Sequence, residues 1–201
     1  VLLKNNNQTL PLNPSLNFLV IGRGAKEISK AAGGWSFTWQ GTGTTNKDFP
    51  GATSIYEGLE LFVEKNNGTI SYSKKGKFTK TPDIAILVIG EDPYAEYQGS
   101  INSLEFLNDD FEHLKVAKDL REKGVKVVYL FLSGRPMWVN RELNTSDAFV
   151  AAWLPGTEGH GIAEVLFGKT IEGEVTDFKG KLSFSWPKEA DASSLNKNDS
   201  F

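Results

Sequence analysis

The chain alternates between short runs of consecutive apolar residues and longer stretches whose apolar residues recur every three or four positions. Unbroken runs of Ile, Val, Leu and Phe are typical of strands buried on both faces of a sheet, whereas the longer period is typical of helices. Residues 69–73 and 181–186 alternate between apolar and polar side chains, which predicts strands at the edges of the sheet. We predict buried strands at residues 17–22, 83–89, 125–132 and 148–154.

The helical period predicts three helices, at residues 54–64, 109–123 and 158–167. Thr53 or Ser54 can cap the first helix, and Thr157 can cap the third. Gly124 and Gly168 follow the second and third helices, where glycine commonly ends a helix. Strands that alternate with helices in this way predict an α/β fold, with a mostly parallel sheet covered by helices on both faces.

Composition and charge exclude several classes of function. The 201 residues are 39% hydrophobic and 23% charged, which is typical of a globular domain with a full core. The net charge is −3 and the lysines are scattered, so we expect no nucleic-acid partner. No apolar run approaches the roughly 20 residues that cross a bilayer, so we expect no membrane partner. The chain has no cysteine and its two histidines lie far apart, so we expect no metal and no cofactor.

Three acidic residues, Glu91, Asp92 and Glu96, follow the predicted strand 83–89. Pro93 cannot continue a central strand because it has no N–H to donate, so these residues lie on a loop at the carboxyl end of that strand. Ligands bind at this end of open α/β sheets, and a glutamate held by a Pro-Tyr turn is well placed to give or take a proton. A solvated acidic loop is the alternative, and position alone favours it.

Two glycine-rich segments raise the alternative of a nucleotide-binding domain. Gly22-Arg23-Gly24 follows the first buried strand, but Glu27 stands where the dinucleotide motif needs a third glycine or alanine. Gly168-Lys169-Thr170 ends like a phosphate-binding loop, but Ala163 stands where that loop begins with glycine. Neither motif is complete, so both argue weakly for nucleotide binding.

Several separate blocks, in the expected order, carry a resemblance to a known family. The blocks are Leu10-Pro11-Leu12 and residues 32–41, 90–96, 133–136, 151–159 and 184–187. Together they resemble the second domain of glycoside hydrolase family 3, in its exo-β-glucanase/β-glucosidase branch.

The resemblance implies a six-stranded, largely parallel α/β sandwich over residues 1–187, followed by a polar tail or linker at residues 188–201. In this family the sandwich packs on an N-terminal (β/α)₈ barrel that supplies the nucleophilic aspartate. A barrel needs roughly 250 residues, so we expect it outside this chain and expect the chain alone to be inactive. The implied substrate is a β-glucoside or β-glucan oligosaccharide, and the family's usual setting is secreted or periplasmic.

The resemblance also assigns roles to individual residues. Glu96 matches the general acid/base, which is expected to have a raised pKa because of apolar burial or the negative nucleophile nearby. Trp39 matches the tryptophan that stacks on the sugar, and Trp35 is expected to pack inside the domain, where Gly33-Gly34 lets the backbone approach closely.

Other residues in these blocks have structural interpretations. We expect Glu91 to brace the loop or cap backbone N–H groups, Asp92 to be a turn residue, and Arg135 to brace a carboxylate or the domain interface. Glu158 is expected to occupy the positive end of its helix. Trp138, Trp153 and Trp186 are expected in the core or at an interface. A non-catalytic carbohydrate-binding or regulatory module on the same fold is the alternative function.

Overall fold

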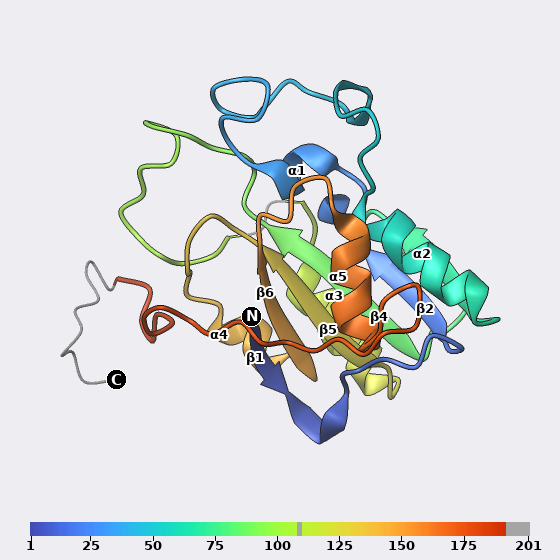
Figure 1. The fold of residues 1–201 in the computed structure, drawn as a ribbon. Helices are drawn as coiled ribbons and strands as arrows, with labels where there is room; N and C mark the ends of the chain where they lie inside the picture. Colours follow the sequence, from blue (N-terminus) through green and yellow to red (C-terminus); the bar gives the residue numbers. More distant parts are fainter. Residues whose placement is uncertain (108–109, 192–201) are drawn as a thin grey trace.

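A computed structural model describes residues 1–107 and 110–191 (Figure 1). Within these residues six strands form a single sheet in the order β1-β6-β5-β4-β2-β3. The strands are β1 (Leu2–Asn5), β2 (Asn17–Ile21), β3 (Thr69–Ser73), β4 (Ile84–Gly90), β5 (Lys126–Leu132) and β6 (Ala148–Trp153). β1 pairs antiparallel with β6, and the other neighbouring strands pair parallel. The predicted mostly parallel, six-stranded sheet is confirmed.

Helices cover both faces of the sheet, which confirms the predicted three-layer sandwich. The helices are α1 (Ile28–Ala32), α2 (Ile55–Lys65), α3 (His113–Glu122), α4 (Asn140–Asn144) and α5 (Gly159–Phe167). α2 and α5 lie side by side on one face (Figure 1), where Leu59 and Leu166 contribute to one hydrophobic cluster. α3 packs on the other face, where Ala117 and Leu120 contribute to a second cluster.

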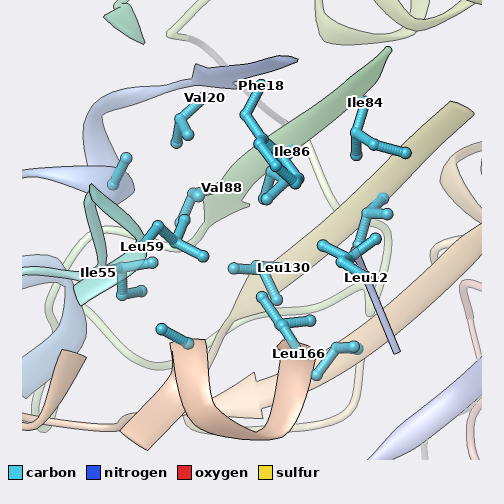
Figure 2. Close-up of a cluster of buried hydrophobic side chains, with 14 of the residues drawn as sticks. Leu12, Phe18, Val20, Ile55, Leu59, Ile84, Ile86, Val88, Leu130 and Leu166 are labelled. Atoms are coloured by element: carbon cyan, nitrogen blue, oxygen red, sulfur yellow. The ribbon is translucent and has the colours of Figure 1, made fainter. Parts of the chain in front are cut away.

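The apolar runs are unbroken because each central strand is buried on both faces. Along β4, Ile84, Ile86 and Val88 belong to the cluster beneath α2 and α5. The residues between them, Ala85 and Leu87, belong to the cluster beneath α3, as expected from side chains that alternate between faces. Figure 2 shows side chains of β2, β4 and β5 meeting those of α2 and α5 in the first cluster.

Most helix ends follow the sequence signals. α3 begins at His113, and residues 110–112 of the predicted helix 109–123 are not helical, whereas residue 109 lies outside the described residues. Ser54 caps α2: its hydroxyl accepts a hydrogen bond from Glu57 N at 3.2 Å, and Glu57 Oε2 accepts one from Ser54 N at 2.7 Å. Gly168 follows α5 in the left-handed conformation, with φ of 70°. The predicted Thr157 cap is wrong, because Glu158 occupies the cap position of α5 and forms no side-chain cap bond.

The edge of the sheet next to β6 differs from the prediction. Residues 181–186 form no strand, so the predicted final edge strand is wrong. β1 occupies that edge instead, and the amino group of Val1 donates a hydrogen bond to Ala151 O at 2.8 Å. Trp186 packs against Phe131 and Trp153, with ring centroids 6.3 and 5.9 Å apart. The other edge is β3, as predicted.

The predicted tail begins in contact with the domain. Leu104 N donates a hydrogen bond to Ala190 O at 2.6 Å, and Asn140 donates one to Lys188 O at 3.3 Å. Residues 192–201, the greater part of that segment, lie outside the described residues, and the boundary at residue 187 stays a prediction. Across the described ranges, no helix combines the length and the apolar character needed to cross a bilayer.

A surface pocket whose lining includes Arg23, Lys30 and Gly90 lies at the carboxyl ends of β2 and β4, where the order of the strands reverses. β2 leads through α2 to β3 on one side, whereas β4 leads through α3 to β5 and then β6 on the other side. A reversal of this kind opens the crevice in which α/β sheets bind ligands. The loops that follow β2 and β4 lie together beyond these strand ends, around α1 (Figure 1).

Candidate active site

The loop of residues 91–99 starts at the carboxyl end of β4 and is braced through Glu91. Glu91 Oε1 accepts hydrogen bonds from Arg135 Nε at 3.0 Å and Nη2 at 2.8 Å, and Ser133 donates its hydroxyl to Glu91 Oε2. Arg135 Nη1 also donates to Gly99 O at 2.6 Å, so one guanidinium joins both ends of the loop. The predicted bracing roles of Glu91 and Arg135 are confirmed.

The predicted turn at Asp92 is wrong, because residues 91–95 form no turn, and Asp92 instead pairs with two cations. Its Oδ1 accepts hydrogen bonds from Lys30 Nζ at 2.7 Å and Arg23 Nη2 at 2.8 Å. Lys30 is only 3% exposed, and its ammonium also donates to Gly90 O at 3.2 Å. Burial alone would raise the pKa of Asp92, but the hydrogen bonds and positive charges of Lys30 and Arg23 lower it overall. These contacts fasten the start of the loop to the residues that follow β2.

Glu96 lies on the exposed part of this loop, with its carboxylate against an indole. Trp39 Nε1 donates a hydrogen bond to Glu96 Oε2 at 2.6 Å. The Trp39 N–H, followed by the backbone N–H of Glu96 itself and by Trp35, lowers the pKa of Glu96. In this chain the shift is therefore opposite to the raised pKa expected of a general acid. A carboxylate that is both exposed and hydrogen-bonded is readily ionised.

Exposed aromatic side chains lie beside the Glu96 carboxylate. The exposed fractions are 70% for Trp35, 45% for Trp39 and 81% for Tyr97. The Trp39 and Tyr97 rings meet edge to face with centroids 5.8 Å apart. The prediction that Trp35 packs inside the domain is wrong, because its side chain is largely exposed, on a residue whose backbone is left-handed with φ of 59°. Exposed apolar groups gathered in this way commonly mark a binding surface.

The loop that carries the tryptophans, residues 33–41, packs directly on the Glu96 loop. A Cβ atom at Gly34 would overlap the backbone carbonyl of Tyr94, so only glycine fits there. The close approach expected at Gly33-Gly34 therefore joins the two loops and does not bury Trp35.

Gln40 forms a second link between the loops, which sequence reasoning missed. Ala95 N donates to Gln40 Oε1 at 2.7 Å, and Gln40 Nε2 donates to Glu96 O at 2.9 Å. The signal was present, because Gln40 follows Trp39 inside one of the blocks that carry the family resemblance.

Within residues 1–107 and 110–191, no group of three or more histidine and acidic side chains is placed to hold a metal ion. His113 instead pairs with the buried Glu142, Nε2 to Oε1, at 2.8 Å. The exposed His160 lies 3.4 Å from Glu158.

The structure is a three-layer α/β sandwich that presents a glutamate and two indoles beyond the carboxyl ends of its strands, where α/β domains commonly bind ligands. The chain belongs to glycosyl hydrolase family 3, because residues 1–200 match the family model described as "Glycosyl hydrolase family 3 C-terminal domain".

The relatives are glycoside hydrolases with longer chains. The chain is 32% identical to the lysosomal beta glucosidase of Dictyostelium discoideum over 92% of its own length and 24% of that protein. It is 55% identical to the exo-1,3/1,4-beta-glucanase of a Pseudoalteromonas species, whose crystal structure matches with a TM-score of 0.92 over 100% of this chain and 25% of that one. A beta-glucosidase from Listeria innocua shares the fold, with 24% identity and a TM-score of 0.64 over 84% of this chain and 23% of that one. The chain thus spans about a quarter of each relative.

Proposed function

We propose that this chain provides the general acid/base, Glu96, and part of the sugar-binding surface of a retaining, exo-acting β-glucosidase or β-glucan hydrolase. The hydrogen bond between the exposed Glu96 carboxylate and the half-exposed indole of Trp39 is the observation that carries the proposal. It sets a proton-transfer group beside a flat apolar surface of the kind that sugar rings stack on.

The other half of the reaction belongs to an N-terminal (β/α)₈ barrel in the same polypeptide. The sandwich accounts for about a quarter of each relative, which leaves ample length for a barrel of roughly 250 residues. The barrel's aspartate would attack the anomeric carbon from one side while Glu96 acts from the other. Retaining enzymes hold these two carboxyl groups about 5–5.5 Å apart.

The reaction proceeds in two proton-transfer steps at Glu96. In the first, its carboxylic acid protonates the glycosidic oxygen as that bond breaks and the aspartate forms a covalent glycosyl-enzyme. In the second, the Glu96 carboxylate takes a proton from water, and the resulting hydroxide displaces the aspartate. The barrel would also exclude water and bring the nucleophile's negative charge, and both effects raise the pKa of Glu96 towards the range an acid needs.

Substitution of Glu96 in the full-length enzyme tests the proposal. Glu96→Ala should lower the rate on substrates with poor leaving groups by about 10²- to 10⁴-fold, the usual contribution of general acid–base catalysis. On substrates with good leaving groups, where breakdown of the glycosyl-enzyme limits the rate, azide should restore part of the activity and yield the β-glycosyl azide, because a small anion can occupy the space left by the carboxylate and attack that intermediate.

Glu91→Gln is the matched control, because Glu91 lies in the same loop but is held by Arg135 and Ser133. Azide should not restore any activity that this variant loses. Full activity of Glu96→Ala, or azide rescue of Glu91→Gln, would assign the acid/base to another residue.

The exposed aromatic side chains also favour a second candidate, a carbohydrate-binding module without a catalytic role. In that case Trp39→Ala would weaken binding of the full-length protein to β-glucan oligosaccharides. Glu96→Ala would then leave hydrolysis unchanged, an outcome that separates the two functions.

A further inference from the structure

We propose that Gln40 is a positioning residue for Glu96: its side-chain amide grips the backbone at Ala95 and Glu96, and thereby holds the carboxylate against Trp39. This inference rests on the proposed acid/base function of Glu96. It adds a residue that itself contacts neither the proton nor the sugar.

The Glu96 carboxylate needs such support, because the backbone that carries it has no strand ladder. Residues 91–95 have no regular secondary structure, and Glu96 is exposed. The loop's own hydrogen bonds, from Gly99 N to Ala95 O and from Gln98 N to Glu96 O, close a turn without tying it to the domain. Arg135 hydrogen-bonds the two ends of the loop, at Glu91 and Gly99, and its guanidinium lies over the Tyr94 ring, so these contacts leave Ala95 N and Glu96 O to other partners.

Gln40 links the backbone at Ala95 and Glu96 to the loop of residues 33–41. Among the described residues it is the side chain from outside the loop that hydrogen-bonds both Ala95 N, at 2.7 Å, and Glu96 O, at 2.9 Å. One bond needs an acceptor and the other needs a donor. Glutamine offers both at the end of one side chain, whereas glutamate has no donor when ionised, and methionine has no donor and only a weak acceptor.

The residues on either side of Gln40, Trp39 and Gly41, hold its backbone in place. Trp39, immediately before it, binds the Glu96 side chain, so two consecutive residues hold the side chain and the backbone of the same glutamate. Gly41, immediately after it, has a left-handed φ of 72°, and a Cβ atom there would overlap Gly33 O and crowd Pro93. The backbone on either side of Gln40 is therefore closely constrained.

A double-mutant cycle in the full-length enzyme tests the inference. Gln40→Met keeps the size of the side chain and removes both hydrogen bonds. It should lower kcat by about 10- to 100-fold, the cost of a small misplacement of a catalytic group, with a much smaller change in KM. In a Glu96→Ala background the same substitution should cost nothing further, because Gln40 acts through Glu96.

Two further variants accompany the cycle, one as a control and one that keeps a single hydrogen bond. Gln98→Ala is the matched control: Gln98 is exposed, lies two residues from Glu96, and its side chain makes no hydrogen bond within the described ranges, so kcat should not change. Gln40→Glu keeps the acceptor for Ala95 N–H and loses the donor to Glu96 O, so its loss should be intermediate. If Gln40→Met does not fold, Gln40→Glu tests the positioning role of Gln40 in its place.

A spectroscopic readout on this chain needs no catalysis. The indole N–H resonance of Trp39, assigned by its loss in Trp39→Phe, should shift as Glu96 is protonated, because the two groups share a hydrogen bond. In Gln40→Met or Gln40→Glu that shift should shrink and its midpoint should rise towards the ordinary pKa of glutamate. In Gln98→Ala both should stay as in the parent chain.

Failure of the proposed function and failure of the role of Gln40 would give different results. Full activity of Glu96→Ala would overturn the proposed function. An equal loss from Gln40→Met with and without Glu96, or no loss at all, would overturn the role of Gln40 alone. So would an unchanged Trp39 titration in both Gln40 variants.

Discussion

Trp39 presents two chemical features, a half-exposed ring face, which we propose stacks on sugar, and an N–H that donates to the Glu96 carboxylate. The two can be separated by substitution, because phenylalanine keeps a ring and lacks the donor. The ionisation of Glu96 and the affinity for substrate therefore need not change together.

We expect Trp39→Phe to raise the pKa of Glu96 in this chain, since the indole N–H is the first cause of its lowering. Trp39→Ala should in addition raise KM of the full-length enzyme roughly 2- to 10-fold, which corresponds to the 0.5–1.5 kcal/mol of an aromatic stacking contact. NMR titration of the Glu96 carboxyl and steady-state kinetics measure the two effects. Trp138→Phe is the control, because Trp138 lies far along the chain from this loop. An equal shift in the pKa of Glu96 in this variant would contradict the role of the Trp39 N–H.

At the scale of elements, α2 and α5 lie against each other but begin differently. α2 opens with the reciprocal Ser54–Glu57 capping box, whereas α5 opens without a side-chain cap. Thr157, the residue that the pattern favours as a cap, bonds Glu158 Oε1 at 3.2 Å instead.

Ser54→Ala should therefore lower the free energy of unfolding by about 0.5–2 kcal/mol, the usual cost of losing a cap. Thr157→Ala should change it far less. The hydrogen bonds from Ser54 lower the pKa of Glu57, so their stabilisation is present above the unfolded pKa of Glu57 and is lost as pH falls through its folded value. Urea unfolding at neutral and acidic pH checks both statements, and equal losses from the two variants would contradict them.

The elements that sequence could predict are those whose signal is local. β4 and β5 are runs of seven residues buried almost throughout, and their patterns place them correctly. β1 is missed because it has only four residues, none of them fully buried. Residues 181–186 alternate like a strand, but β1 already occupies the position beside β6. The alternating pattern shows that residues 181–186 could form a strand, but it cannot show that β1 takes the place beside β6.

The site was predictable only through resemblance. Trp39 and Glu96 lie 57 positions apart and meet because two loops converge beyond the sheet, a relation that no local period records. The burial of Lys30 against Asp92 was likewise invisible, because lysine in a helical stretch ordinarily faces solvent.

At the scale of the whole molecule, we propose that the exposed carboxylate and the aromatic surface form one half of an active site. In this chain the pKa of Glu96 is lowered, so the group is ionised at neutral pH and is a poor proton donor. The proposed barrel would contribute the nucleophile and the environment that protonates it.

We therefore expect this chain alone to hydrolyse no aryl β-glucoside. We also expect the pKa of Glu96 to lie below its ordinary value in the chain alone, and above it in the full-length enzyme. Carboxyl NMR measures the first value, and the alkaline limb of the kcat/KM profile reports the second. Turnover by the chain alone, or an alkaline limb that Glu96→Gln leaves in place, would contradict this division of labour.

The contact between Gly34 and Tyr94 has a practical consequence for engineering within this family. Two surface segments that touch through main-chain atoms have no side-chain layer to absorb a change in either one. When loops are exchanged between relatives to change specificity, residues 33–41 and 91–99 should therefore be replaced together. If only one loop were replaced, its main-chain contacts with the other loop would no longer fit.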